Sequence, residues 1–207
     1  MSEAVEIIKN LTSDDYEKGI VNLHIHTTYS DGMGKFCDIA KQASEKYKVF
    51  AVTDHNTVQG HIDNPETGAV VGVEFDVWYK YIFLHLLAYG IDPNNERMKK
   101  FYAKDKKGTE KDIIRILSGR NIKELIKAIH EAGGIAVLAH PACCWALSMD
   151  SFIKDLKKIG LDGVEVYYPY PRWRKYFKFA SAEYISKIAD KYQLIKTGGT
   201  DCHEENL

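Results

Sequence analysis

The sequence lacks the features that mark several broad classes of protein. Its 207 residues carry a formal net charge of -1, so there is no overall basic excess to sustain sequence-independent nucleic-acid binding. No apolar run reaches the roughly 18 residues that suggest a membrane span. The chain has only five prolines, and no internal repeat, low-complexity tract or linker divides it. We therefore expect a single domain over residues 1–207, with residues 1–19 as an N-terminal extension or helix.

Cysteine is also scarce, and its placement argues against a disulfide framework. The four cysteines form no CxxC pair, and Cys143 and Cys144 are adjacent, a spacing that ordinary disulfides avoid. The first ten residues lack a basic segment followed by an apolar one, so they do not resemble a secretory signal. We expect reduced thiols, a cytoplasmic location and no membrane partner.

Short β-type runs rich in Val, Ile, Leu and Tyr alternate with helical patterns. Apolar residues spaced at i, i+3, i+4 and i+7 predict helices near residues 36–43 and 122–129, and residues 152–159 and 176–192 also look helical. Segment 94–120 is expected to be helical at both ends, with a break at Gly108. This alternation predicts an α/β fold with a mostly parallel sheet, compact enough to form a seven-stranded barrel. The expected strands are Ile20–His26, Val49–Asp54, Ala69–Phe75, Ile82–Tyr89, Ile135–His140, Gly163–Tyr168 and Leu194–Thr197.

One connection is too short for a crossover helix. Residues 77–81 can form only a tight turn, which predicts an antiparallel hairpin between the third and fourth strands. A turn centred near Tyr79-Lys80 places Glu74 opposite His85, close enough to share a metal ion.

Potential metal ligands stand at or near the ends of nearly all the predicted strands, where β/α barrels build their active sites. Imidazole and carboxylate together suit Zn, Mn or Fe better than Ca. Nine ligands exceed what one ion of four to six ligands can use, so two or three ions are implied. The nine candidates are His24, His26, Asp31, His55, Glu74, His85, His140, Asp201 and His203.

Simpler explanations exist for single members of this set. His85 alone could be a hydrogen-bonded core residue, Glu74 a buried ion-pair partner, and Asp31 a helix cap. So many ionisable groups packed together without metal would be costly, which favours the metal interpretation for the whole set. His61 and His130 fall outside it, and we expect both to be exposed to solvent.

These motifs together resemble the PHP (polymerase and histidinol phosphatase) superfamily. The resemblance spans residues 24–203, and it is the combination of motifs that is specific. It runs through His24-Ile25-His26, Ser30-Asp31-Gly32, Thr53-Asp54-His55, Gly72-Val73-Glu74, His85–Gly90, Ala139-His140-Pro141 and Gly199-Thr200-Asp201-Cys202-His203.

The resemblance implies a distorted seven-stranded (β/α)7 TIM-like barrel with a trinuclear site for phosphoester hydrolysis. It assigns one ion to His24, His26, Glu74 and Asp201, a second to Asp31, His55 and His203, and a third to Glu74, His85 and His140. Asp54 would orient a ligand. Catalytic roles fall to Asp31, His55, Glu74 and His203.

The span from His85 to His140 is short for the family, so we expect a reduced lid over the site. Because the chain ends soon after His203, elements that bind substrate could be absent or come from a partner subunit.

A cluster of cations and aromatics follows the sixth strand and suggests substrate binding. Arg172, Arg174 or Lys175 could grip a phosphate, and Tyr168, Tyr170 or Trp173 could contact a base, although a solvated helix start with core aromatics explains them equally well.

We predict a hydrolase that uses metal-activated hydroxide on a small phosphomonoester such as a nucleotide or bisphosphate. Alternatives are an exonuclease acting on short oligonucleotide ends and a non-catalytic metal-bound interaction module. Long nucleic acid is not the expected substrate. Sequence leaves the oligomeric state open.

Overall fold

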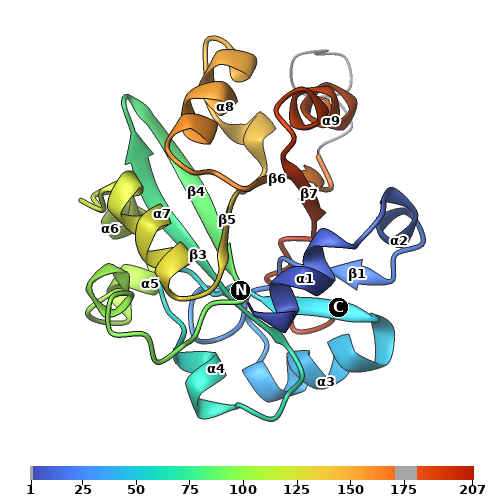
Figure 1. The fold of residues 1–207 in the computed structure, drawn as a ribbon. Helices are drawn as coiled ribbons and strands as arrows, with labels where there is room; N and C mark the ends of the chain where they lie inside the picture. The colour runs from blue at the N-terminus through green and yellow to red at the C-terminus, as the bar shows by residue number, and fades with distance from the viewer. Residues whose placement is uncertain (1, 171–180) are drawn as a thin grey trace.

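Seven strands follow one another around a single, nearly closed sheet (Figure 1). The structure is a computed structural model that describes residues 2–170 and 181–207. The sheet order is the chain order, as expected for a distorted barrel of the TIM type. The strands are β1 (Val21–Asn22), β2 (Val49–Val52), β3 (Val70–Tyr79), β4 (Ile82–Tyr89), β5 (Ile135–Leu138), β6 (Gly163–Tyr167) and β7 (Ile195–Gly198).

The barrel is brought towards closure by backbone that continues beyond β1 and β7. Leu23 N donates to Gly198 O at 3.0 Å, and Asp201 N donates to His24 O at 2.9 Å. Ile25 and Cys202 form a parallel bridge further along. Gly199 permits this approach, because a Cβ there would clash with the backbone nitrogen of His24. Residues 24 and 201 therefore lie side by side although 177 positions separate them in the chain.

The predicted antiparallel hairpin is present, but its register differs from the expectation. Tyr79 pairs with Ile82, so the turn consists of Lys80 and Tyr81, with Lys80 at φ 57°. His85 consequently lies opposite Asp76, while Glu74 lies opposite Leu87. Because moving the turn centre by one residue shifts every partner by two, each side chain keeps its face. Glu74 still reaches His85 along the diagonal.

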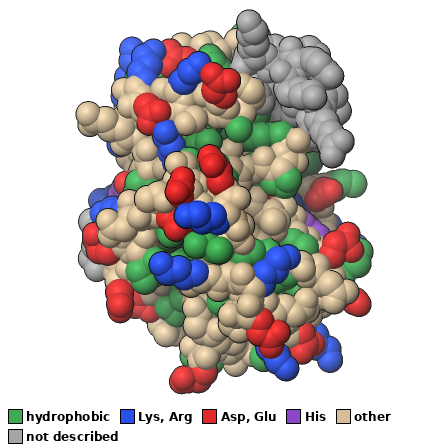
Figure 2. All heavy atoms as spheres, turned by 90° about the vertical axis from the view of Figure 1, so that its right-hand side faces the viewer, with side chains coloured by type: hydrophobic (Ala, Val, Ile, Leu, Met, Phe, Trp, Pro, Cys, Tyr) green, Lys and Arg blue, Asp and Glu red, His purple; other side chains and the backbone are tan. Residues whose placement is uncertain are grey.

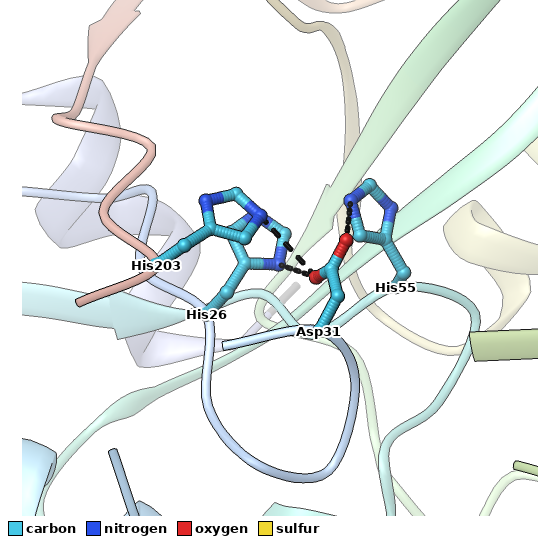
Figure 3. Close-up of side chains that lie close together, drawn as sticks. All are labelled: His26, Asp31, His55 and His203. Carbon is cyan, nitrogen blue, oxygen red and sulfur yellow. Dashed lines mark ion pairs between the residues drawn. The ribbon is translucent and has the colours of Figure 1, made fainter. Parts of the chain in front are cut away.

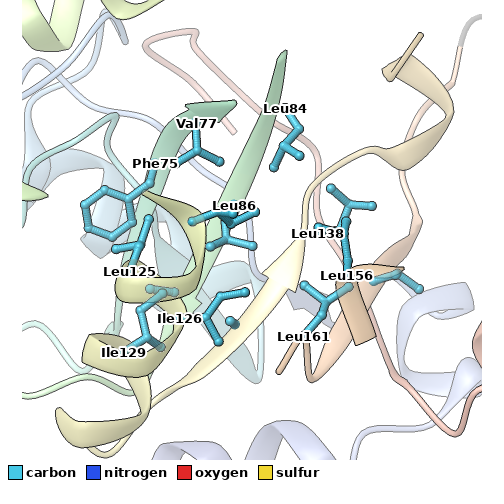
Figure 4. Close-up of a cluster of buried hydrophobic side chains, with 14 of the residues drawn as sticks. Phe75, Val77, Leu84, Leu86, Leu125, Ile126, Ile129, Leu138, Leu156 and Leu161 are labelled. Atoms are coloured by element: carbon cyan, nitrogen blue, oxygen red, sulfur yellow. The ribbon is translucent and has the colours of Figure 1, made fainter. Parts of the chain in front are cut away.

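Helices cover the outside of the sheet and bury one apolar face each. In helix α7 (Ile122–Glu131), Leu125, Ile126 and Ile129 are buried against Phe75 and Leu86 of the hairpin (Figure 4). Asn121 caps this helix as predicted, accepting hydrogen bonds from the backbone of residues 123 and 124. The similar outer helices are α3 (Phe36–Lys46), α8 (Met149–Lys158) and α9 (Ala182–Lys191).

Two short helices precede the first strand, α1 (Glu3–Lys9) and α2 (Ser13–Glu17). Val5 and Ile8 of α1 are buried in one cluster with Leu23 and Tyr89. In Figure 1, α1 lies across one opening of the barrel. It therefore seals the end of the barrel where β4 finishes, leaving the other end for polar residues.

The connection from β4 to β5 contains the 3-10 helix η1 (Lys99–Phe101) and helices α5 (Lys107–Glu110) and α6 (Asp112–Ile116). Gly108 lies inside α5, so the predicted break at Gly108 is wrong. The chain instead becomes extended at Lys111, with φ -105° and ψ 110°. The remaining short elements are α4 (Gln59–Asp63) and the 3-10 helix η2 (Pro141–Cys143). None of the helices in the described ranges combines the length and apolar character needed to span a membrane.

Candidate metal centre

The nine candidate ligands come together at one end of the barrel. His24 and His26 alternate with Leu23 and Ile25, whose side chains are buried in the surrounding core, so both imidazoles point the same way. Four groups of facing ligand atoms form among the described residues, and we name three of them the first, second and third positions. These consist of His24, His26, Glu74 and Asp201; of Asp31, His55 and His203, with His26 beside them; and of Glu74, His85 and His140. The fourth group is His55, Asp76 and His85.

In the first position, four buried atoms face one another at nearly equal distances. His24 Nε2 lies 3.2 Å from Glu74 Oε2 and 3.3 Å from Asp201 Oδ1, and His26 Nε2 lies 3.2 and 3.1 Å from the same two oxygens. None of these atoms makes a hydrogen bond among the described residues, and Glu74 Oε2 also lies 3.3 Å from His55 Nε2. A tetrahedral ion about 2.0–2.1 Å from each ligand separates the ligands by about 3.3 Å. The residues therefore fit a divalent ion such as Zn.

Two buried carboxylates that the sequence analysis did not select stand behind the histidines. Glu165 Oε1 lies 3.0 Å from His24 Nδ1, and its other oxygen accepts from the backbone nitrogen of His140 at 2.8 Å. Asp76 Oδ1 lies 3.1 Å from His85 Nε2. Carboxylates in this place fix the tautomer of a ligating histidine and raise its basicity. The alternation of side chains along a strand could have predicted both carboxylates. Asp76 lies two residues after Glu74 and so points to the same face, and Glu165 points inward between two buried valines.

The second position contains a cation that the sequence analysis missed. Its predicted ligands lie close together, with His203 Nε2 3.2 Å and His55 Nε2 3.7 Å from oxygens of Asp31 (Figure 3). Arg115 of α6 enters the same space. Its Nη1 donates to Asp31 Oδ2 at 2.5 Å, its Nη2 to His55 Nε2 at 2.8 Å, and its Nε to Asp76 Oδ1 at 3.3 Å.

The third position shares Glu74 with the first. Glu74 Oε1 lies 2.9 Å from His85 Nδ1 and 3.1 Å from His140 Nε2. His140 adopts φ 25°, which is unusual for a residue other than glycine and turns the chain directly after β5. The three atoms form a compact set that could hold an ion.

Asp54 acts on the turn that carries Asp31. It accepts hydrogen bonds of 2.7 Å from Thr27 N, Thr27 Oγ1 and Ser30 Oγ. Ser30 Oγ in turn lies 3.5 Å from His26 Nδ1. The carboxylate thus fixes the loop between His26 and Asp31 and contacts neither ligand itself through a hydrogen bond in the described structure.

Burial and neighbouring charges shift the pKa values of the clustered histidines and of Glu74 in opposite directions. Burial alone would lower the pKa of His24, but Glu74, Glu165 and Asp201 outweigh it and raise that pKa well above its usual value. The pKa of His26 rises to about 9, because Asp201 and Glu74 outweigh burial. For His55, burial dominates and lowers the pKa well below its usual value. Glu74 has a depressed pKa, since the surrounding imidazoles outweigh its burial.

The two histidines outside the set, His61 and His130, differ in their exposure to solvent. His61 was expected to be exposed, but only 6% of it is, and its Nε2 lies 2.9 Å from Val52 O. The expectation was wrong because α4 packs His61 edge-on against Phe36. The side chain of His130 is 40% exposed, and its Nε2 lies 2.7 Å from Asp162 Oδ2.

The predicted phosphate-gripping residues Arg172, Arg174 and Lys175, and Trp173 beside them, lie outside the described residues. Tyr168 is described, and its hydroxyl donates to Asp201 Oδ2 at 3.0 Å. Its ring centroid lies 5.2 Å from that of His140. Tyr168 thus contributes to the wall of the centre. Tyr170 lies behind it and accepts from the backbone nitrogen of Ala142 at 3.4 Å.

Comparison with known sequences finds two similar proteins. No protein-family model matches it. An uncharacterised protein of Methanocaldococcus jannaschii is 30% identical over 164 residues, covering 73% of this chain and 82% of that protein. A phosphoribosyl 1,2-cyclic phosphate 1,2-diphosphodiesterase of Eggerthella lenta is 23% identical, covering 89% of this chain and 94% of the enzyme.

Solved structures have the same fold. A putative metal-dependent phosphoesterase from Bifidobacterium adolescentis matches with a TM-score of 0.71 and 20% identity, covering 90% of this chain and 88% of that one. A two-domain protein from Bacteroides vulgatus, containing a predicted PHP-like metal-dependent phosphoesterase, matches with a TM-score of 0.53 and 12% identity, covering 89% of this chain and 52% of that one. These matches show that the chain has the fold of PHP-like proteins, and the 30% identity shows that it belongs to one family with the Methanocaldococcus jannaschii protein.

Proposed function

We propose that this protein is a metal-dependent phosphoesterase that hydrolyses a small phosphomonoester, such as a nucleotide or bisphosphate, at a centre of two or three Zn, Mn or Fe ions. The observation that carries the proposal is the first position, where four buried ligand atoms converge and none of them makes a hydrogen bond among the described residues. Burying such groups without a counterpart is costly. A divalent cation satisfies all four at once.

Bound ions would supply Lewis acidity and a nucleophile at neutral pH. The chain's own residues hold and orient the reacting groups. His24, His26, Glu74 and Asp201 would hold one ion, and Glu165 and Tyr168 fix two of those ligands. Arg115 contributes a permanent positive charge. A guanidinium has five N–H donors; Nε and Nη2 each contact one group and Nη1 contacts Asp31 and, more distantly, Asp112, so a donor on Nη2 remains for a phosphoryl oxygen.

A cavity of about 620 Å³ is lined by residues of the segments that follow His26 and His55, although none of the nine candidate ligands lines it, and we propose that it takes part of a small substrate. Thr28 and Thr57 line it, and they closely follow His26 and His55 in the chain. Lys35, Lys104 and Lys106 also line it. We propose that these lysines, together with the cluster at Arg172, Arg174 and Lys175, bind the parts of the substrate that do not react. Replacing one of these cations should raise KM more than it lowers kcat, as expected when ground-state binding is lost.

Surface charge supports a small substrate over a long polyanion. On the face shown in Figure 2, acidic and basic side chains are interspersed and form no continuous basic track. The net charge of -1 adds little long-range attraction. All four cysteines are free, which supports a reducing, cytoplasmic location. We further propose that residues 1–207 act as one barrel domain, because α1 packs into its core.

A small cyclic phosphodiester is a second candidate substrate. The Eggerthella lenta relative is named as a diphosphodiesterase of a phosphoribosyl cyclic phosphate, and the alignment covers most of both chains. A phosphodiester leaves the same metal-ligand set and the same Arg115 in use. The two candidates differ only in how many ester bonds the reacting phosphorus carries.

The test is a substrate panel run with and without metal. It contains sugar phosphates, nucleoside mono- and bisphosphates, ribose cyclic phosphates, and short and long oligonucleotides. We expect hydrolysis of a small phosphate ester, complete loss on chelation, and recovery with one of the three metals. Preferred cleavage of long DNA or RNA with a steep salt dependence would instead support the nuclease alternative. Binding of less than one metal equivalent, with no hydrolysis, would support the non-catalytic module.

A further inference from the structure

Helix α6 places its only cation inside the protein and its aliphatic residues outside. Arg115 is 6% exposed, whereas Ile113 and Ile116 are 78% and 43% exposed, and Leu117 directly after the helix is 78% exposed. This reverses the usual pattern, in which arginine is exposed and isoleucine buried. Burying a guanidinium costs free energy unless charged partners compensate. Asp31 and Asp76 supply that compensation from within the centre, and Asp112 lies 3.5 Å away at its edge.

The contact between Arg115 and His55 determines which imidazole nitrogen is free. A guanidinium only donates, so His55 Nε2, 2.8 Å from Nη2, must accept and the ring proton must lie on Nδ1. Nε2 has one lone pair in the ring plane, and this hydrogen bond uses it. An ion in the second position would need the same lone pair. The arginine contact and coordination by His55 Nε2 are therefore mutually exclusive.

Asp31 leads to the same conclusion from the other side. Its Oδ2 accepts from Arg115 Nη1 at 2.5 Å, so the oxygen nearer to His55 is already paired with a cation, while Oδ1 makes no hydrogen bond and faces His203 Nε2 at 3.2 Å. In the first position, by contrast, all four facing atoms lack such a partner among the described residues. In the third position, Arg115 contacts none of the three ligands. The guanidinium thus opposes an ion at one position of the three.

We propose that Arg115 takes the place of the second ion, so that the resting centre binds two divalent cations, in the first and third positions. The inference rests on the proposed function, because it assumes a centre that binds divalent ions. A fixed guanidinium would then provide positive charge at the second position without depending on metal supply. It could do so because the short connection between β4 and β5 brings α6 directly to the centre.

The test counts ions. Metal-free protein is titrated with Zn or Mn by calorimetry, and bound metal is measured by elemental analysis after desalting. We expect two equivalents for the natural protein and three for Arg115→Met, which keeps an unbranched side chain and loses the charge. Arg120→Met is the matched control, because Arg120 is also partly buried and reaches the backbone oxygen of Asp76 but no candidate ligand. It should still bind two.

Three equivalents in the natural protein, or two in folded Arg115→Met, would overturn the inference and leave the proposed function standing. No bound metal in the natural protein would overturn both. If Arg115→Met does not fold, anomalous scattering from crystals of the natural protein soaked in Zn decides the matter. Ions in the first and third positions alone support the inference, and an ion bound to His55 Nε2 refutes it.

Discussion

The first and second positions of the centre use the same residue types. They differ in whether a positively charged side chain already contacts the ligand atoms. In the first, four ligand atoms lie 3.1–3.3 Å apart across its histidine–carboxylate contacts and depend on each other. In the second, a guanidinium contacts Asp31 and His55. Histidine and carboxylate at close range are therefore insufficient evidence for an ion. Whether each ligand atom already accepts a hydrogen bond from another group decides how well a metal ion can bind there.

The two positions also differ in how the chain supports them. His24 and His26 follow β1 directly, Glu74 lies within β3, and Asp201 is bonded to the backbone of His24. Asp31 comes from a turn and His203 from an irregular segment, and their side chains are 23% and 34% exposed. Sites on strands hold their geometry better than sites on loops. We expect the first position to bind its ion more tightly than any position built on these segments.

The largest effect should come from removing a ligand of the first position. Asp201→Asn keeps the shape of the side chain and removes the charge that balances an ion. We expect phosphoester hydrolysis to fall by at least about 100-fold, since a catalytic ion contributes several kcal/mol. Elemental analysis should show one ion fewer, and circular dichroism an unchanged fold. The control is Asp190→Asn, which removes only a surface pair with Lys196. Full activity with a full metal complement in Asp201→Asn would refute the assignment of the first position.

A smaller effect is expected from the carboxylate behind His24. Glu165→Gln preserves the acceptor for the backbone nitrogen of His140 but removes the charge facing His24 Nδ1. Losing such a partner typically weakens metal affinity by about 10–100-fold. Competition with a chromogenic chelator measures this change, and Glu124→Gln on the surface is the control, since it contacts only Lys100 there. Equal affinities in Glu165→Gln and the natural protein would show that His24 needs no such support.

These differences show which parts of the molecule could be predicted from sequence. The runs Val49–Asp54 and Ile135–His140 predicted strands that the structure forms over Val49–Val52 and Ile135–Leu138, because buried β-strands are short and rich in aliphatic residues. Ligands at strand ends followed from barrel geometry, since those ends meet at one opening. The sequence thus predicted which residues would gather there.

Tertiary contacts explain what the sequence left out. Arg115 is 84 residues from Asp31, and the local pattern around it gives only an unusual mixture of isoleucine and arginine. His61 stands in a polar segment, and only the packing of α4 on Phe36 buries it. The predicted hairpin turn was one residue too early, because strand length near Tyr79 depends on cross-strand pairing more than on residue type.

The smallest effect should come from His130, a histidine outside the centre. Its hydrogen bond to Asp162 raises its pKa above 6.5, with partial burial acting more weakly in the other direction. A raised pKa in the folded state means that the protonated form stabilises the fold. That contribution is complete below the unfolded pKa of 6.5 and disappears as the pH rises through the folded pKa.

His130→Ala should therefore leave metal content and hydrolysis unchanged. It should lower the free energy of unfolding by under about 1 kcal/mol at acidic pH, because the side chain is 40% exposed and water screens the pair. Urea unfolding at about pH 5.5 and about pH 9 measures the difference, which should shrink at the higher pH. Lys123→Ala on the same helix is the control and should show no such dependence. Loss of hydrolysis in His130→Ala, with His26→Ala still active, would mean that the active site lies elsewhere on the barrel.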